Sequence, residues 1–250
     1  EGVVLLKGTF RDWVEPLRAG IERNMADPSP LERTYRPDDG RSPFFQDYCS
    51  WDRIPEYQDF VRNSAMAETA AGLMRSKTAR IFHEHVLVKE PGNSMATPWH
   101  QDQPYYCVDG MQTASFWVAL DDIPRERALE YVVGSHKPEG LFRPKRFSGD
   151  DLYDNDDAPE APDIEANRDA FDIRGWAVEA GDAVVFNFRM LHAASANASD
   201  ERRRVISFRW VGDDATYAER KGPTSPPLTG LTMKHGDPFD DPQFPVIYQG

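Results

Sequence analysis

The sequence predicts a mainly β protein with some α-helix: a double-stranded β-helix of the jelly-roll or cupin-like type, with a helical lobe before it. Two observations lead to this prediction. Apolar residues first recur at helical spacing in two stretches, and seven or so short strand-like stretches separated by turn signals then follow. Helices followed by many short strands are typical of an antiparallel sandwich or barrel, and such barrels often hold a binding site in the mouth.

The expected helices lie at residues 10–25 and 56–75. Each carries an apolar stripe at helical spacing: Phe10, Trp13, Val14, Leu17 and Ile21 in the first, and Phe60, Val61, Met66, Ala70, Leu73 and Met74 in the second. A proline-rich loop follows the first helix. The aromatic stretch 44–51 has no clean period.

Strand-like sequence begins near residue 79, where Val, Ile and Phe alternate with other residues until Pro91-Gly92 ends the pattern. Turn signals such as Asp109-Gly110 separate several of the stretches that follow. Further strands are expected at 97–108, 113–120, 129–133, 176–178, 182–188 and 203–211.

We expect residues 1–250 to form a single domain. Its parts are a helical lobe at 1–78 that packs on a jelly-roll catalytic core at 79–211, and a Pro/Gly-rich tail at 212–250. Inside the core, residues 149–172 are acidic and interrupted by prolines. They indicate an insertion or a lid rather than a core strand.

Composition limits the partners. The 250 residues include 29 Lys and Arg against 42 Asp and Glu, a formal net charge of 29 − 42 = −13. This argues against nucleic acid or an anionic membrane as a partner, although local arginines can still hold an anionic substrate. No apolar run approaches the roughly 20 residues of a membrane span, and Cys49 and Cys107 form no disulfide framework. We therefore expect a cytoplasmic protein that acts on a small molecule, with no oligomeric state favoured.

The stretch "TPWHQDQPYY", residues 97–106, carries two side chains that can bind a metal, His100 and Asp102. On a strand they would project from the same face. The third ligand must come from elsewhere, and His192 is favoured over the other histidines because it follows the turn and apolar strand "GDAVVFNF". Two histidines and one carboxylate form the arrangement of non-heme Fe(II) oxygenases, although a zinc hydrolase can use the same ligands.

An arginine supplies a second part of the pattern. Arg203 comes eleven residues after His192 and begins a strand on which Arg203, Val205 and Ser207 share a face. A guanidinium aimed inward near a metal can pair with the far carboxylate of a 2-oxo dicarboxylic acid whose keto-acid end chelates the metal. A register shift of one residue would turn Arg202 or Arg204 inward instead, and Arg209 is a weaker alternative.

These residues resemble the phytanoyl-CoA dioxygenase (PhyH) family of Fe(II)/2-oxoglutarate-dependent oxygenases. The resemblance covers about 79–211 and rests on five stretches: "PWHQD" (98–102), "FWVALDD" (116–122), "ALEYVVGSHK" (128–137), "GDAVVFN" (181–187) and "LHAASAN…RRRVISFRW" (191–210). It implies that His100, Asp102 and His192 bind the iron and that Arg203 pairs with the 2-oxoglutarate carboxylate. It also implies an enzyme that oxidises a small molecule with O2, while 2-oxoglutarate is converted to succinate and CO2.

The resemblance implies further positions around the co-substrate. Trp117 and, less directly, His85 fall at positions that line the co-substrate pocket, and Gln101 is the usual residue between the two ligands. The family commonly has Pro-Gly-Ser-His where this chain has Val133-Gly134-Ser135-His136. Halogenating relatives lack the carboxylate ligand, so the presence of Asp102 makes hydroxylation of an unactivated C–H bond the expected outcome.

The substrate stays open at this point. One aromatic cluster could line a substrate pocket, or belong to core packing, or form part of a cage for a cationic head group. Its members are Trp99, Tyr105 and Tyr106, with Phe44, Phe45, Tyr48 and Trp51. Two other functions remain possible. The first is a non-oxidative cupin-like metal hydrolase or isomerase, which would have no use for Arg203. The second is a non-catalytic carbohydrate-binding jelly roll, in which the aromatic side chains stack on sugar.

Overall fold

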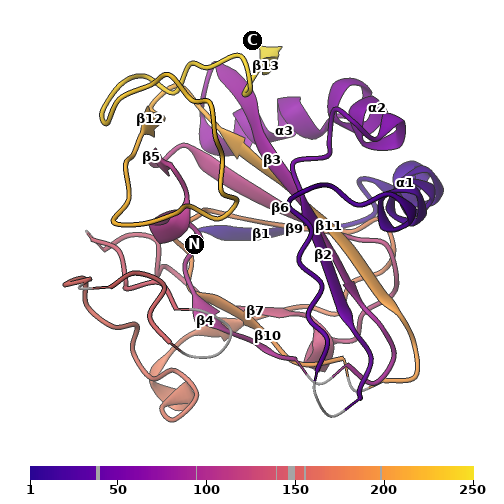
Figure 1. Ribbon diagram of the computed structural model, residues 1–250. Coiled ribbons are helices and arrows are strands. Elements are labelled where there is room, and N and C mark those ends of the chain that lie inside the picture. The colour runs from indigo at the N-terminus through magenta and orange to yellow at the C-terminus, as the bar shows by residue number, and fades with distance from the viewer. Residues whose placement is uncertain (38–39, 94, 139, 146–149, 155, 198) are drawn as a thin grey trace.

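The computed structural model describes residues 1–250 except 38–39, 94, 139, 146–149, 155 and 198 (Figure 1). Its larger layer is a seven-stranded antiparallel sheet in the order β1 (Val3–Leu6), β9 (Ala183–Phe186), β6 (Thr113–Ala119), β11 (Arg203–Val211), β3 (Thr78–Lys89) and β13 (Val246–Gln249), with β2 (Phe44–Tyr48) also paired to β3. A second sheet has the order β4 (Thr97–His100), β10 (His192–Ala194), β7 (Leu129–Val132) and β8 (Ile173–Arg174). Two short strands, β5 (Val108–Asp109) and β12 (Thr216–Tyr217), pair separately.

The inner faces of the two sheets pack against each other. One hydrophobic cluster joins Trp117 and Val205 of the larger sheet to Leu129 and Tyr131 of the smaller one. Because strand side chains alternate between faces, β11 divides its residues between two environments. Val205 contributes to this inter-sheet cluster, whereas its neighbour Ile206 joins the core on the other face.

The helices cover the other face of the larger sheet. They are α1 (Val14–Ala26), α2 (Pro55–Asn63) and α3 (Met66–Met74), and their apolar stripes pack with side chains such as Phe116 and Phe208 in the largest core cluster. The expected helix at 10–25 is confirmed, with a short 3-10 turn at Arg11–Trp13 before it. The expected helix at 56–75 is two helices, because Ser64 adopts an extended conformation and interrupts the first.

Several strands differ from the expectation. The strand expected at 97–108 ends at His100, and the one expected at 176–178 is only an isolated bridge between Val178 and Ile123. The parts expected to be a helical lobe and a tail contribute strands to the core sheet: β1 and β2 from the first, β13 from the second. The sequence of β2 shows no alternation of polar and apolar residues. All five of its residues are buried, so both faces of the strand lie inside the protein.

The insertion and the tail lie against the body without forming long strands. The described residues of 149–172 include buried Ile164, which packs with Val132 of β7 and Leu191. In the tail, Phe239 and Phe244 pack with Tyr106 and neighbouring aromatic residues. Within the described residues, every helix is too short or too polar to cross a membrane.

Candidate metal centre and active-site cavity

The end of β4 and the start of β10 bring His100 and His192 together. The two residues are Cα partners in the antiparallel pair, and their ring centroids are 4.2 Å apart. Asp102 follows the end of β4, where the backbone N–H groups of Asp102 and Gln103 both donate to Phe188 O, at 2.9 and 3.0 Å. The expected role of strand alternation is therefore wrong: a turn, and not the strand, places the carboxylate beside the two imidazoles.

The three side chains offer one ligand atom each to a common point. Asp102 Oδ1 lies 3.5 Å from His100 Nε2 and 3.8 Å from His192 Nε2. All three candidate ligand atoms lie within 4.8 Å of one another. Asp102 and His192 are buried, whereas His100 is partly accessible. The geometry therefore presents two nitrogens and one oxygen on one side of a possible metal position.

The other ring nitrogens are held by backbone carbonyls. His100 Nδ1 lies 2.8 Å from Pro98 O, and His192 Nδ1 lies 3.0 Å from Met190 O. A carbonyl oxygen only accepts hydrogen bonds, so each Nδ1 carries the proton and donates it. In the neutral ring this leaves a lone pair on each Nε2, the atom that faces Asp102. Metal-binding histidines are commonly oriented in this way.

Ionisation also suits a metal. Burial acts to raise the pKa of the Asp102 carboxyl, but His100, His192 and Arg209 outweigh burial and hold that pKa well below its usual range. Burial, with His100 adding to the effect, lowers the pKa of His192 to about 3. At neutral pH an ionised carboxylate thus faces a neutral imidazole, as metal binding requires. The donor set matches the two-histidine, one-carboxylate arrangement of non-heme Fe(II) sites.

The remaining contacts of Asp102 come from two directions. The Tyr105 hydroxyl donates a hydrogen bond to Asp102 Oδ1. Asp102 Oδ2 is buried without a hydrogen bond to the described residues, and Arg209 Nη2 lies 3.8 Å from it. An ionised carboxylate with one oxygen unsatisfied has room for a further partner, and a metal ion fits that need.

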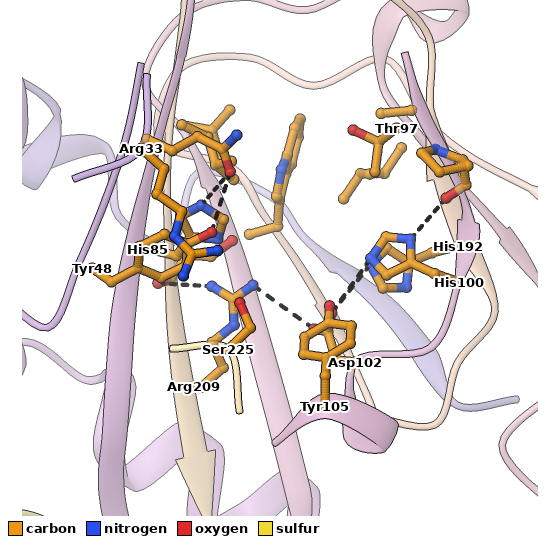
Figure 2. A pocket seen from close by; sticks show the side chains of 18 of the residues that line it. Arg33, Tyr48, His85, Thr97, His100, Asp102, Tyr105, His192, Arg209 and Ser225 are labelled. Atoms are coloured by element: carbon orange, nitrogen blue, oxygen red, sulfur yellow. Dashed lines mark hydrogen bonds and ion pairs between the residues drawn. The ribbon is translucent and has the colours of Figure 1, made fainter. Parts of the chain in front are cut away.

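A cavity with a volume of ≈ 550 Å³ opens beside the triad and between the two sheets. Leu87 and Val205 line it from the larger sheet, and Leu129 and Ala194 line it from the smaller. Figure 2 shows the triad on one side of this cavity and Arg33, Tyr48 and His85 on the other, with Arg209 between them and its guanidinium directed toward Asp102. The volume falls in the range of small-molecule sites.

Arg203, Trp117 and His85 all line this cavity, as expected for co-substrate contacts. Arg203 is 8% exposed and donates from Nη1 to Arg127 O at 2.6 Å. Burial, with a contribution from Arg127, lowers the pKa of Arg203 to about 10, so its guanidinium stays charged at neutral pH. Among the described residues no acid forms an ion pair with it. The contacts that Arg203, Trp117 and His85 make with a co-substrate remain predictions.

Two other expected positions lie outside the cavity. Gln101 donates to Arg189 O at 2.7 Å and accepts from the Phe142 N–H at 3.0 Å, so both ends of its amide hold loops together. Trp99 donates to Glu165 at 3.0 Å and lines a smaller cavity of ≈ 180 Å³. Neither side chain lines the main cavity, so the expected cofactor contact of Gln101 and substrate contact of Trp99 stay predictions that this cavity does not support.

Tyr105 and Tyr106 do line the main cavity, together with Phe44 and Tyr48 of the same aromatic set and with further residues that the sequence did not indicate. These come from the segment before α2 and from the tail: Arg33, Tyr35, Phe44, Gln46, Tyr48, Pro223, Thr224 and Ser225. The signal that could have found some of them is the alternation of Phe44, Gln46 and Tyr48, which share one face of β2. Burial of both faces of β2 hid that period.

The fold and the site together define a class, the Fe(II)/2-oxoglutarate-dependent oxygenase fold with a two-histidine, one-carboxylate cluster. The phytanoyl-CoA dioxygenase (PhyH) family matches residues 1–205, and the chain therefore belongs to this family. The family, the fold and the enzyme class expected from the sequence are confirmed at this level.

Known relatives by sequence are distant. Phytanoyl-CoA dioxygenase 1 of Oryza sativa subsp. japonica is 24% identical over 163 residues, which are 61% of this chain and 54% of that protein. L-proline trans-4-hydroxylase of Streptomyces griseoviridis is 32% identical over 139 residues, 50% of this chain and 52% of that protein. The chain spans about half the length of the curated relatives it matches.

Solved structures match nearly the whole chain. The non-heme alpha ketoglutarate dependent carbocyclase SnoK from nogalamycin biosynthesis is 25% identical with a TM-score of 0.76, and the match covers 98% of this chain and 92% of SnoK. The epimerase SnoN, solved in complex with Fe3+, alpha ketoglutarate and nogalamycin RO, is 22% identical with a TM-score of 0.76, covering 99% and 94%. The second similarity supports the fold alone.

Proposed function

We propose that this protein is an Fe(II)/2-oxoglutarate-dependent dioxygenase that hydroxylates an unactivated C–H bond of a small molecule. In the complete reaction the substrate, 2-oxoglutarate and O2 give the hydroxylated product, succinate and CO2. The observation that carries the proposal is the convergence of His100 Nε2, His192 Nε2 and Asp102 Oδ1 beside a cavity that also contains the buried guanidinium of Arg203.

Each side chain has a task in this proposal. His100, His192 and Asp102 would hold Fe(II), which when bound supplies the activation of O2 and the oxidation of the C–H bond. Pro98 O and Met190 O keep the two imidazoles turned toward the metal, and the Tyr105 hydroxyl holds Asp102. A fixed first set of ligands keeps the reactive position in a constant place relative to the substrate.

Arg203 would bind the far carboxylate of 2-oxoglutarate. One N–H donates to Arg127 O, and the remaining donors are available for the two oxygens of a carboxylate. Trp117 would pack against the co-substrate, because it pairs with Ser207 across the sheet and lines the same cavity. The apolar walls keep water from the bound co-substrate.

The reaction outcome needs its own support. One relative is named a proline hydroxylase, whereas two structural neighbours are named a carbocyclase and an epimerase. We favour hydroxylation because Asp102 occupies the carboxylate position and the relative with the highest sequence identity among those described above is a hydroxylase. Product mass decides the question, since hydroxylation adds one oxygen atom, whereas epimerisation leaves the mass unchanged.

The test of the proposed function is an anaerobic titration of the purified protein with Fe(II) and 2-oxoglutarate. We expect a weak visible metal-to-ligand charge-transfer band that needs both additions. The same protein under air is then screened for succinate formation with a panel of small molecules, and products of active compounds are analysed by mass. Absence of the band, with folded protein and bound iron, would contradict the proposal and favour a non-oxidative metal protein.

A further inference from the structure

Two arginines that line the cavity, Arg33 and Arg209, bind neither the metal nor the co-substrate in the proposed function. Arg209 is 5% exposed, and its Nε donates to the Tyr106 hydroxyl at 2.8 Å while its Nη1 donates to Ser207 O at 3.3 Å. Its Nη2 reaches only to 3.8 Å from Asp102, which is too long for a hydrogen bond. Arg33 extends into the cavity beside Tyr48 and forms no ion pair with another described residue (Figure 2).

The charges of the cavity do not balance after the metal and co-substrate are counted. Its lining includes the cations Arg33, Lys145, Arg203 and Arg209, and Asp102 is the acid among the described lining residues. Lys145 pairs with Glu160, outside the lining, at 3.4 Å. If Asp102 binds the metal and Arg203 binds 2-oxoglutarate, the guanidinium groups of Arg33 and Arg209 are left without an assigned ligand. The excess is positive inside a chain whose formal net charge is −13.

A buried amide in the same wall adds an unsatisfied donor. Gln46 is fully buried, and its Oε1 lies 2.9 Å from His85 Nε2 and 3.3 Å from the Tyr48 hydroxyl. Its Nε2 has no hydrogen-bond partner among the described residues. A buried N–H group without an acceptor is costly and rare, which indicates that something else supplies the acceptor.

The three groups lie around the same two aromatic rings. Arg33 and Arg209 are both close enough to Tyr48 and His85 to affect their ionisation. Gln46 bonds to both of these rings, which stack with their centroids 4.0 Å apart. Two guanidinium groups and one amide N–H thus lie around one stacked pair of rings, and all three are hydrogen-bond donors.

We propose that the primary substrate carries an anionic oxygen group, a carboxylate or a phosphate, which binds to Arg33, Arg209 and the Gln46 amide. The rest of the substrate lies over the apolar wall toward the triad. This assignment rests on the proposed function, because it takes Arg203 and Asp102 as occupied by co-substrate and metal. It opposes the cationic head group that the aromatic residues alone left open, since the guanidinium groups of Arg33 and Arg209 would repel a cation.

The test uses four six-carbon probes that differ in one end: hexanoate, hexyl phosphate, hexanamide and hexylamine. Their binding is measured by calorimetry, under anaerobic conditions, to protein saturated with Fe(II) and 2-oxoglutarate so that Arg203 is not available. We expect at least one anion to bind about tenfold or more tightly than the neutral amide, because hydrogen bonds to a charged group are strong, and the amine to bind weakest. Comparison of hexanoate with hexyl phosphate distinguishes the two anion types.

Three variants test the residues. Arg33→Met and Arg209→Met should each remove most of the preference for the anion over the amide, whereas the control Arg202→Met, on the opposite side of the sheet, should keep it. Arg33 is at the surface, so its variant remains informative if Arg209→Met does not fold. Equal binding of anion and amide, no binding of either anion, or an unchanged preference in both Arg33→Met and Arg209→Met overturns the proposal.

Failure of the proposed function would look different. In that case the protein gives no charge-transfer band with Fe(II) and 2-oxoglutarate, whatever the probes do. The probes are then titrated without co-substrate against Arg203→Met as well as Arg33→Met. An anion preference that depends on Arg33 and not on Arg203 supports the anion site even without the oxygenase reaction, and a preference that depends on Arg203 alone overturns it.

Discussion

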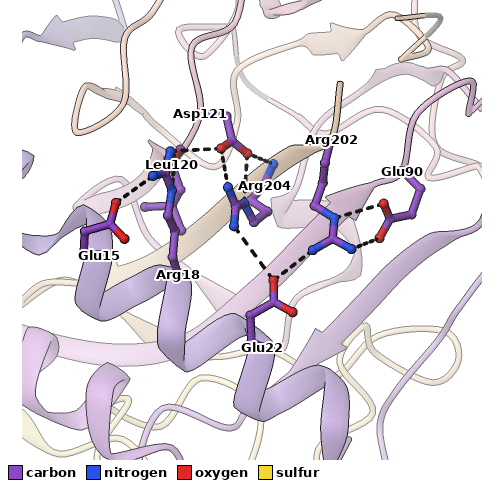
Figure 3. A network of polar contacts seen from close by, with 8 residues as sticks. All are labelled: Glu15, Arg18, Glu22, Glu90, Leu120, Asp121, Arg202 and Arg204. Carbon is purple, nitrogen blue, oxygen red and sulfur yellow. Dashed lines mark hydrogen bonds and ion pairs between the residues drawn. The ribbon is translucent and has the colours of Figure 1, made fainter. Parts of the chain in front are cut away.

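The two faces of β11 carry arginines in opposite situations. On the outer face Arg204 makes three bonds to Asp121, at 2.8, 3.1 and 2.7 Å, and Arg202, just before the strand, pairs with Glu90 and Glu22 at 2.8 and 2.9 Å (Figure 3). On the inner face Arg203 and Arg209 bond to backbone carbonyls and a tyrosine, and Asp102 lies 3.8 Å from Arg209 without a hydrogen bond to it. The outer charges are neutralised by the protein itself.

The difference indicates which arginines await a ligand. A buried charge loses its hydration, and it is costly unless a counter-charge and hydrogen bonds replace that hydration. Arg202 and Arg204 already have these partners near the surface, so their contribution is to the fold. Arg203 and Arg209 are more buried and less neutralised, so the inner face gains most from anionic molecules in the cavity. The predictions below test this division.

The largest effect is expected from Asp102→Ala. Loss of the carboxylate removes one of three candidate ligands, so metal-dependent succinate formation should fall to background and the affinity for Fe(II) should drop. The matched outer-face change, Asp121→Ala, should keep both. Succinate is measured by mass spectrometry and iron affinity by anaerobic titration. If Asp102→Ala retained wild-type turnover, the assignment of the metal centre would be wrong.

The second largest effect should distinguish Arg203 from Arg204, which are neighbours on β11 and face opposite sides of the sheet. Arg203→Met should raise the KM for 2-oxoglutarate by roughly ten- to a hundredfold, because the lost bonds to a carboxylate are worth about 1.5–3 kcal/mol. Arg204→Met should leave that KM unchanged, since Arg204 faces Asp121. Initial rates over a range of 2-oxoglutarate concentrations measure both. A raised KM in Arg204→Met with an unchanged KM in Arg203→Met would reverse the assignment of the faces.

A third prediction concerns Lys89, the cross-strand partner of Arg203. Burial and Arg203 lower the pKa of Lys89 to about 6 from its ordinary 10.5. Between these values the unfolded chain binds more protons than the folded one, so this residue makes stability rise with pH, by up to about 1.4 kcal/mol per pH unit. Lys89→Met should remove that part of the slope, measured by urea unfolding without co-substrate from about pH 7 to 9.

The control for Lys89 is an exposed lysine. Lys221→Met, at the surface, should leave the slope of unfolding free energy against pH as it is in the original protein. Equal slopes for Lys89→Met and the original protein would show that Lys89 stays charged in the folded chain. The inner face would then hold another fully charged cation, and the contrast with the outer face would be larger than proposed.

The sequence predicted the parts of the site that local patterns specify. His100 and Asp102 lie two apart in sequence, His192 follows an apolar stretch and Arg203 begins one, and the structure brings all four to one cavity. The course of the backbone between His100 and Asp102 was not predicted. β4 ends at His100, and Asp102 lies in a turn whose N–H groups bond to Phe188 O. A hydrogen bond across 86 positions leaves no trace in local periodicity.

The opposite wall could not be predicted for a related reason. Gln46 lies on β2, whose two faces are both buried, so no alternation of polar and apolar residues marks it. Arg33 and Ser225 lie in proline-rich segments whose contacts depend on how the chain ends fold over the core. The strands β1 and β13 are short and pair with partners more than a hundred residues away, so only the assembled sheet defines them.

The smallest effect is expected from Glu22→Gln on the outer face. Glu22 accepts from Arg202 at 2.9 Å and lies 3.8 Å from Arg204, but its side chain is 53% exposed. Exposed ion pairs contribute little, so the free energy of unfolding should fall by about 0.5 kcal/mol or less, and less still in high salt. The KM for 2-oxoglutarate should not change. A change in that KM would show that the outer network positions Arg203 through the strand, and the two faces of β11 would then act as one unit.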